Sequence, residues 1–255
     1  MIDTHAHIYL KELEPERVAM IERAKAAGVQ RIYMPAIDSS EMDSLLETEK
    51  QYSDYCLAMM GLHPCYVKEN YLDELALVEK WLGKRRFAAV GEIGLDRYWD
   101  RSYDQQQIDA FRQQMEWALK YKLPVVIHTR EAMEATIEEV APFAGRGLRG
   151  IFHCFGGSSE QAEQIVKMGF CLGIGGVLTY KKSGLAEVLQ SDSIPLDALV
   201  VETDTPYLSP VPHRGKKNEP AYLPLVVQRL AEVRGLELDE VIQRTTLRAL
   251  EIFGK

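Results

Sequence analysis

Residues 87–130 read FAAVGEIGLDRYWDRSYDQQQIDAFRQQMEWALKYKLPVVIHTR and contain two short apolar runs, at 87–92 and 123–128. Between these runs, Ile108, Phe111, Met115 and Ala118 recur at the spacing of one helical face. An apolar strand, an amphipathic helix and a second apolar strand form a βαβ unit with parallel strands. The stretch therefore predicts a helix-covered parallel sheet.

The same alternation of apolar run and helical segment extends over the whole chain. The eight runs are residues 1–7, 31–37, 55–62, 87–92, 123–128, 150–154, 170–177 and 198–204. After the sixth run, Ser158 and Gln161 form a capping-box signature, and Gly169 follows at the expected end of that helix. Eight units in 255 residues, with no GxGxxG after the first, favour an α/β fold of the (β/α)8 TIM-barrel type over an open doubly wound sheet. No linker or repeat divides residues 1–255, which we expect to form a single domain.

Composition limits the classes of function. The formal net charge of −8 argues against a general nucleic-acid coat protein, but less so against an enzyme whose bound cations face the substrate. The four cysteines form no CxxC pair and indicate reduced thiols in a cytoplasmic protein. No apolar run approaches the roughly 18 residues that span a bilayer, and polar residues interrupt the place of a signal peptide. We therefore expect no membrane association, and we see no sign of an obligate protein partner.

Ionisable residues stand at or just after the carboxyl end of six of the eight runs. They are His5 and His7, His63, Glu92, His128, His153, and the pair Glu202 and Asp204. A buried unpaired carboxylate or imidazole costs several kcal/mol, so stability does not account for six such positions. In a TIM barrel these strand ends meet at one mouth, where active sites lie. Several histidines and carboxylates together are typical of a metal site.

Six of these residues are too many ligands for one tetrahedral zinc. We expect His5, His7, Glu92, His128, His153 and Asp204 to hold two divalent ions about 3.5–4 Å apart, with Glu92 as the bridge. His5 and His7 would bind one ion, and His128 and His153 the other. The residue types leave zinc, manganese and magnesium open.

The motifs DTHAH, GLHP, GEIGLD, VIHTR, FHCF and VETDTPYLSP…RGKKNEP, from Asp3 to Asn218, resemble the signatures of the TatD-type metal-dependent deoxyribonucleases. The resemblance implies an amidohydrolase-like TIM barrel, two divalent metals and phosphodiester hydrolysis that is typically exonucleolytic. The family's metal ligands match the six positions named above. The expected substrate is a nucleic acid, in first place single-stranded DNA.

The expected chemistry uses a metal-activated water that attacks phosphorus in line. Asp204 and Glu92 are the candidate catalytic residues: Asp204 would ligate one ion and orient or deprotonate the water. Glu202 would tune a ligand from outside the coordination sphere. In the loop SPVPHRGKKNEPAY, residues 209–222, Arg214 and Asn218 are candidate phosphate-binding residues, together with His63.

Tyr98 and Trp99 offer rings that could stack on an unpaired base, although packing at the barrel rim is the simpler interpretation.

Two alternatives remain open at the level of sequence. An amidohydrolase acting on a small cyclic amide, lactone or ester would share the HxH pair, the later histidines and the last aspartate. Many such barrels bridge their metals with a carbamylated lysine on strand four, where this chain has Glu92, which favours the nuclease. A non-catalytic metal or nucleic-acid binding protein would not need the complete ligand set with Asp204.

Overall fold

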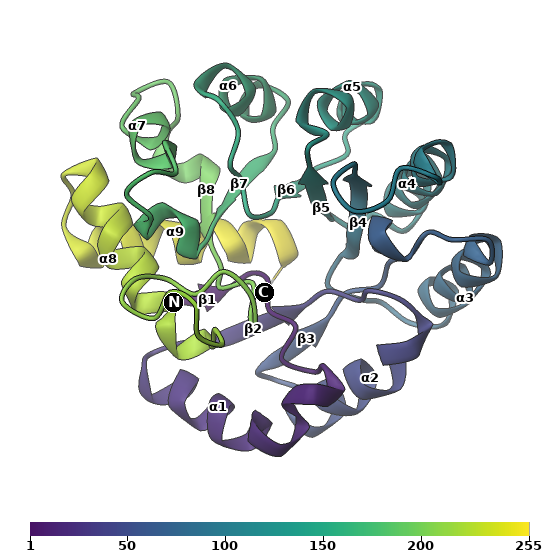
Figure 1. The fold of residues 1–255 in the computed structure, drawn as a ribbon, viewed down its shortest axis with the longest axis horizontal. Coiled ribbons are helices and arrows are strands. Elements are labelled where there is room, and N and C mark those ends of the chain that lie inside the picture. Colours follow the sequence, from purple (N-terminus) through teal and green to yellow (C-terminus); the bar gives the residue numbers. More distant parts are fainter. Residues whose placement is uncertain (255) are drawn as a thin grey trace.

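The computed structural model describes residues 1–254. Its eight parallel strands form a barrel, in which they are arranged in chain order (Figure 1). They are β1 (Ile2–Asp3), β2 (Arg31–Met34), β3 (Cys56–Ala58), β4 (Val90–Asp96), β5 (Val125–Arg130), β6 (Gly150–Phe152), β7 (Cys171–Ile174) and β8 (Leu199–Val201). Regular hydrogen-bonded pairing connects β1, β2 and β3 in one set of neighbouring strands, and β4, β5, β6, β7 and β8 in another. Single parallel bridges, Met60 with Val90 and Ala6 with Thr205, connect the two sets and close the barrel. The predicted (β/α)8 fold is confirmed.

Helices surround the strands, as expected for a parallel barrel (Figure 1). They are α1 (Glu14–Ala26), α2 (Met42–Gln51), α3 (Tyr71–Lys84), α4 (Asp104–Tyr121), α5 (Met133–Ala144), α6 (Ser159–Lys167), α7 (Leu185–Leu189), α8 (Leu223–Arg234) and α9 (Leu238–Phe253). The capping box before α6 is present, with reciprocal bonds between Ser158 and Gln161. Gly169 follows this helix with a φ of 86°, as its predicted place at the helix end requires.

One end of the barrel is filled with apolar side chains. Each strand, or the residue beside it, contributes to one buried cluster, which also takes Ala249 and Ile252 from α9; the strand residues are Ile2, Tyr33, Met59, Ala89, Val126, Ile151, Cys171 and Val200. Ile2, Val126 and Cys171 lie in the first half of their strands, and Ala89 directly precedes β4. Tyr33 also stacks on Phe253 of α9, with ring centres 4.0 Å apart, so α9 closes the amino-terminal end of the barrel (Figure 1). The carboxyl ends of the strands are left for polar residues.

The first strand is shorter than the sequence predicts. The apolar run predicts a strand over residues 1–7, but β1 ends at Asp3. The Asp3 carboxylate is buried and accepts hydrogen bonds from Thr203 N–H at 3.0 Å and Thr203 Oγ1–H at 2.6 Å. These hydrogen bonds connect the end of β1 to the segment after β8. His5 and His7 therefore lie beyond the strand.

Among residues 1–254, no helix is both long and apolar enough to span a membrane. All four cysteines, Cys56, Cys65, Cys154 and Cys171, are free thiols.

Candidate metal centre

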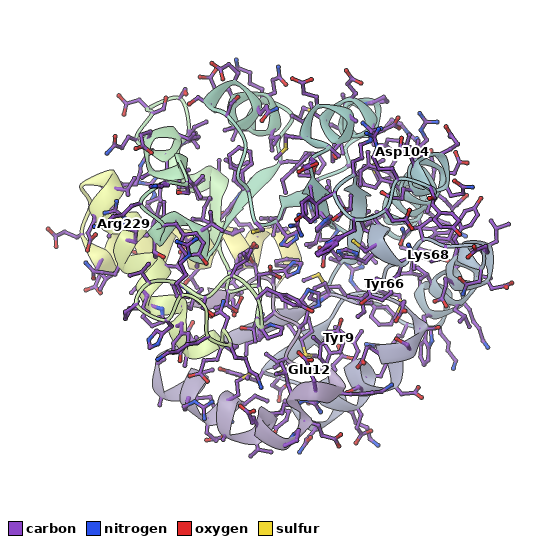
Figure 2. All side chains as sticks on the ribbon, in the orientation of Figure 1. Tyr9, Glu12, Tyr66, Lys68, Asp104 and Arg229 are labelled. Carbon is purple, nitrogen blue, oxygen red and sulfur yellow. The ribbon has the colours of Figure 1, made fainter. Side chains whose placement is uncertain are left out.

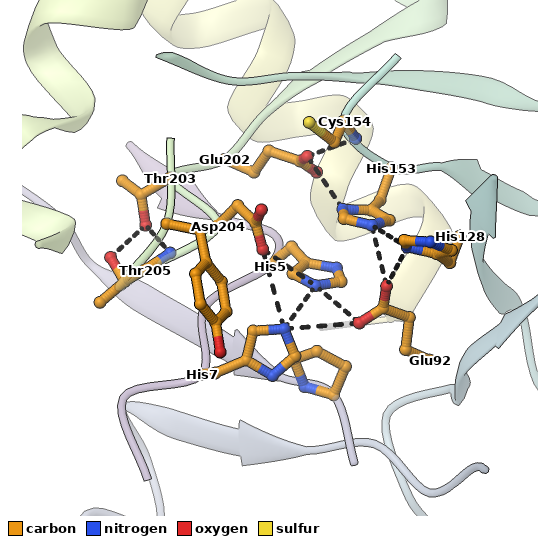
Figure 3. Close-up of polar contacts among 12 residues, drawn as sticks. His5, His7, Glu92, His128, His153, Cys154, Glu202, Thr203, Asp204 and Thr205 are labelled. Carbon is orange, nitrogen blue, oxygen red and sulfur yellow. Dashed lines mark hydrogen bonds and ion pairs between the residues drawn. The ribbon is translucent and has the colours of Figure 1, made fainter. Parts of the chain in front are cut away.

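Glu92 lies between two groups of histidines, with one carboxylate oxygen toward each (Figure 3). Its Oε2 is 3.2 Å from Nε2 of His5 and 3.4 Å from Nε2 of His7. Its Oε1 is 3.0 Å from Nδ1 of His128 and 2.9 Å from Nε2 of His153. The structure thus brings five of the six predicted ligands together around the carboxylate of one residue.

The side chain of Glu92 reaches this position because β4 is irregular there. Gly91 pairs with Val126 and Ile93 with Ile127, so Glu92 is the extra residue of a bulge in the ladder between β4 and β5. A bulge changes the direction of a side chain relative to a regular strand. Two residues on, Gly94 has a φ of 143°, and a Cβ there would overlap the backbone carbonyl of His128. Glycine at 94 therefore lets β4 and β5 approach closely beside the centre.

Asp204 completes the group of His5 and His7. Its Oδ1 is 3.7 Å from Nε2 of each of these histidines. The backbone of Asp204 is left-handed, with a φ of 58°, and its N–H donates to the carbonyl of His5 at 2.9 Å. Such a conformation is costly for a non-glycine residue and is typical of functional sites. Burial raises the pKa of the Asp204 carboxyl to about 6.

The partner of Nδ1 of His7 determines which nitrogen of its ring can bind a cation. Tyr9 donates its only hydroxyl hydrogen to the carbonyl of Pro35 at 2.6 Å, so at His7 Nδ1, 3.2 Å away, it accepts. Nδ1 of His7 therefore carries the hydrogen, and Nε2, which lies beside Glu92, keeps its lone pair.

His128 and His153 are oriented in the same way, each by a carboxylate. Asp96 Oδ2 lies 2.9 Å from Nε2 of His128, and Glu202 Oε1 lies 3.3 Å from Nδ1 of His153. With the hydrogen on the nitrogen nearest each carboxylate, the other ring nitrogen is left as a ligand beside Glu92.

His63 has the opposite arrangement. Its Nδ1 accepts the backbone N–H of Cys65 at 3.0 Å, so the neutral ring carries its hydrogen on Nε2. This Nε2 lies 3.3 Å from Glu92 Oε1, close enough to the centre for a role there. Burial lowers the pKa of His63, which favours the neutral ring. In this tautomer His63 is a hydrogen-bond donor at the edge of the centre.

The charges of the centre depend on one another. Burial opposes ionisation of Glu92, but His63, His153 and His5 hold the pKa of its carboxyl well below the ordinary value. Burial also opposes protonation of His153, yet Glu92 and Glu202 raise its pKa well above the ordinary value. Burial and the neighbouring His153 lower the pKa of His5 well below 6.5.

The donor set fits divalent cations. Three groups of ligand atoms lie close enough to share an ion: His5 with His7 and Glu92, His63 with Glu92 and His128, and His5 with His153 and Glu202. Among the described residues, Glu92 Oε2 is buried and has no hydrogen bond of acceptable geometry, although two imidazole nitrogens surround it. A buried carboxylate oxygen among imidazole nitrogens is a typical ligand for zinc or manganese.

The remaining predicted residues lie outside this cluster. Asn218 is fully buried, and its side-chain amide donates to the carbonyls of Thr203 and Tyr207, both at 2.6 Å. The amide hydrogens of Asn218 hold the loop after β8 in this structure, and its predicted contact with substrate stays a prediction. Arg214 is exposed on that loop, with its guanidinium 4.5 Å from the ring centre of Tyr180.

Sequence reasoning missed two positioning residues, Asp96 and Tyr9. Asp96 stands at the end of the motif GEIGLD, and Tyr9 follows His7 at a spacing of two, HAHIY. Both signals are visible in the sequence, but only the fold shows that Asp96 contacts His128 and that Tyr9 contacts His7.

Comparison with known proteins gives a family match over nearly the whole chain. The family model "TatD related DNase" matches residues 2–254. The chain is 35% identical over 253 residues to an uncharacterized metal-dependent hydrolase, YabD, of Bacillus subtilis, covering 99% of this chain and 98% of that protein. It is 31% identical over 260 residues to the 3′-5′ ssDNA/RNA exonuclease TatD of Erwinia amylovora, with both chains fully covered. The crystal structure of YJJV, a TatD homologue from Escherichia coli, superposes with a TM-score of 0.93 at 29% identity, over 100% of this chain and 98% of that one.

Proposed function

Because the chain belongs to the TatD-related DNase family, we propose that it shortens single-stranded nucleic acid from the 3′ end. Family membership makes it a metal-dependent hydrolase of phosphodiester bonds. The single strand and the 3′ end are supported by a relative, the exonuclease of Erwinia amylovora, whose name specifies them. We extend the proposal to residues 1–255 acting as one catalytic domain, in the cytoplasm, where four free thiols are stable.

The observation that carries the mechanism is the position of the two oxygens of Glu92. His5, His7, Asp204 and Glu92 Oε2 would hold one divalent ion. His128, His153 and Glu92 Oε1 would hold a second, so that Glu92 bridges the two. The histidine-rich donor set favours zinc or manganese over magnesium.

Bound divalent ions would supply Lewis acidity, which polarises the phosphoryl group and lowers the pKa of the attacking water. The residues of the chain supply position and proton transfer. Asp204 Oδ1 is held 3.7 Å from two ligand nitrogens and can orient the water and accept its proton. Nε2–H of His63, now 3.3 Å from Glu92 Oε1, would donate to a phosphate oxygen when that carboxylate oxygen holds an ion. Glu202 fixes His153, and Arg214 is the proposed contact for a phosphate farther along the strand.

A direct test uses single-stranded DNA and RNA labelled at the 5′ or the 3′ end, incubated with zinc, manganese or magnesium and with a chelator. A ladder of shortening 5′-labelled products, with immediate release of the 3′ label as mononucleotide, is the expected result. Release of the 5′ label as mononucleotide, or cleavage only in the interior, would reject the proposed polarity. Absence of cleavage with every ion, in protein shown to contain metal, would favour the small amide, lactone or ester substrates.

A further inference from the structure

Two aromatic side chains are exposed beside the metal centre, immediately after β4. Tyr98 and Trp99 are 48% and 67% exposed, and their rings meet edge to face with centres 4.9 Å apart. Packing at the rim, the simpler interpretation of the sequence, leaves most of Trp99 uncovered. A large exposed aromatic surface next to a catalytic centre is typical of a ligand contact.

Arg130, at the end of β5, lies over these rings. Its guanidinium carbon is 3.8 Å from the ring centre of Tyr98 and 5.2 Å from that of Trp99. Within the described part of the chain, no carboxylate lies within 4.0 Å of Arg130. Nearby Arg97, by contrast, pairs through two hydrogen bonds, of 2.7 and 3.1 Å, with Asp104, labelled in Figure 2 at the start of α4. The charge of Arg130 is therefore available to an anionic ligand.

A cavity of about 560 Å³ adjoins this group on the side of β6. Its lining includes Arg97, Thr129, Arg130, Cys154, Gly156 and Gly157. Thr129 and Arg130 directly follow His128, and Cys154 directly follows His153, so the cavity borders the residues that would hold the second proposed ion. Its volume is within the range of about 300–1,000 Å³ that is typical of sites for small ligands, which includes a nucleotide.

One carboxylate connects the aromatic pair to the metal centre. Asp96 Oδ1 accepts the backbone N–H of Tyr98 at 3.0 Å and that of Trp99 at 3.2 Å. Its Oδ2 lies 2.9 Å from Nε2 of His128. The backbone that carries the two rings is thus held at a fixed position relative to His128, a proposed metal ligand, although it lies in a loop.

We propose that Trp99, Tyr98 and Arg130 form a stacking platform for an unpaired nucleobase of the substrate, next to the scissile phosphate. Trp99 presents its open face to the base, and Arg130 contacts the neighbouring phosphate from the cavity. This inference rests on the proposed function and deepens it, since a base must be unstacked from a partner strand before it can lie on an aromatic ring. The platform thereby accounts for selection of single strands.

The test compares two substrates in the Trp99→Ala and Arg130→Ala variants of the metal-loaded enzyme. One substrate is a single-stranded oligothymidylate, and the other is bis(4-nitrophenyl) phosphate, a small diester without a base. For Trp99→Ala we expect kcat/KM on the oligonucleotide to fall about tenfold, or about 1.4 kcal/mol, while kcat/KM on the small diester stays within about twofold. Trp99→Phe should restore most of the loss, because it retains an aromatic face.

Two controls match these variants. Arg229→Ala removes a half-buried arginine from α8, which lies across the molecule from Asp104, the partner of Arg97 (Figure 2). Leu72→Ala shortens a side chain that is 64% exposed on α3. The platform is rejected if Trp99→Ala behaves like these controls on the oligonucleotide, or if it lowers turnover of both substrates equally.

A binding measurement separates the platform from the proposed function. Stacking of a base on Trp99 should quench tryptophan fluorescence when oligothymidylate is added in the presence of a chelator, and the quench should vanish in Trp99→Ala. Quenching without cleavage by any metal-loaded form would overturn the proposed nuclease function and support the platform. Cleavage by the wild type with a quench that persists in Trp99→Ala would overturn the platform and support the nuclease.

Discussion

Replacing Asp96 with asparagine tests how the second group of ligands is held. Asp96 Oδ2 accepts from Nε2–H of His128 at 2.9 Å, which leaves Nδ1 of His128 as the ligand beside Glu92. An asparagine that keeps its oxygen toward the N–H groups of Tyr98 and Trp99 places an NH2 group against Nε2–H. Two donors in contact force His128 into the other tautomer, in which Nδ1 carries the hydrogen and cannot bind a cation.

The size of the effect follows from what the substitution leaves intact. Loss of a partner that orients a metal-bound histidine lowers metal affinity about 10- to 100-fold, or by about 1.4–2.8 kcal/mol. The two backbone hydrogen bonds at the Asp96 position persist with a neutral acceptor, so the free energy of unfolding of the metal-free protein should fall by only about 1 kcal/mol. The predicted signature is weak metal binding in a folded protein.

The assay is a titration of zinc or manganese against a competing chromophoric chelator, with thermal unfolding of the metal-free protein in parallel. Asp100→Asn is the matched control, because Asp100 lies on the same loop and binds Lys68 at 2.8 Å. We expect one of two binding events to weaken in Asp96→Asn and both to be unchanged in Asp100→Asn. Wild-type affinity for both ions in Asp96→Asn would refute the tautomer argument. The role of Asp96 would then be limited to its hydrogen bonds with the backbone of Tyr98 and Trp99.

Three further predictions concern hydrolysis, metal removal and the loop after β8. Asp204→Asn should lower kcat by about 100-fold or more with an unchanged circular dichroism spectrum, since proton acceptance is lost; near-normal turnover would contradict its role. A chelator should lower the Tm, because ions present at about 100 times their Kd stabilise the folded state by about 2.7 kcal/mol; an equal Tm with and without metal would argue against a resident ion. Asn218→Ala leaves two carbonyls without a donor, and each should lower the free energy of unfolding, measured in urea, by about 1–3 kcal/mol. Lys216→Ala, at an exposed neighbouring residue, is the control and should change this free energy by less than about 0.5 kcal/mol.

The barrel could be predicted from sequence because its strands are buried on both faces. A strand such as β7, with all four residues buried, appears in the sequence as a short apolar run between helical patterns. The order of such runs then fixes the order of parallel strands around the barrel. The sequence pattern does not, however, locate the end of β1. Regular pairing ends at Asp3, but Ala6 still forms an isolated bridge with Thr205, so the apolar run continues past the strand.

The residues gathered at the centre could be predicted from their common position at strand ends, but their individual orientations could not. Glu92 reaches both groups of histidines through a bulge, and a bulge in β4 leaves no pattern that distinguishes it from a regular strand. The protonated nitrogen of His63 depends on the N–H of Cys65, which is a feature of the turn geometry.

Asn218 shows the limit of reasoning from residue type. A polar side chain in a basic loop after the last strand is a reasonable phosphate ligand on composition alone. Whether its amide is free depends on where the carbonyls of Thr203 and Tyr207 lie, and these are set by the path of the loop. In the same loop Arg214 is exposed and Asn218 is buried. The accessibility of these two candidate residues is therefore set by tertiary contacts.

The central claim is that Glu92 bridges two divalent ions. Anomalous diffraction from crystals grown with zinc or manganese tests it most directly, with Glu92→Ala as the comparison. The account predicts two peaks in the wild type, one between His5, His7 and Glu92 Oε2 and the other between His128, His153 and Glu92 Oε1, and loss of at least one of them in Glu92→Ala. A single peak at saturating metal, or two peaks that persist unchanged in Glu92→Ala, would contradict it.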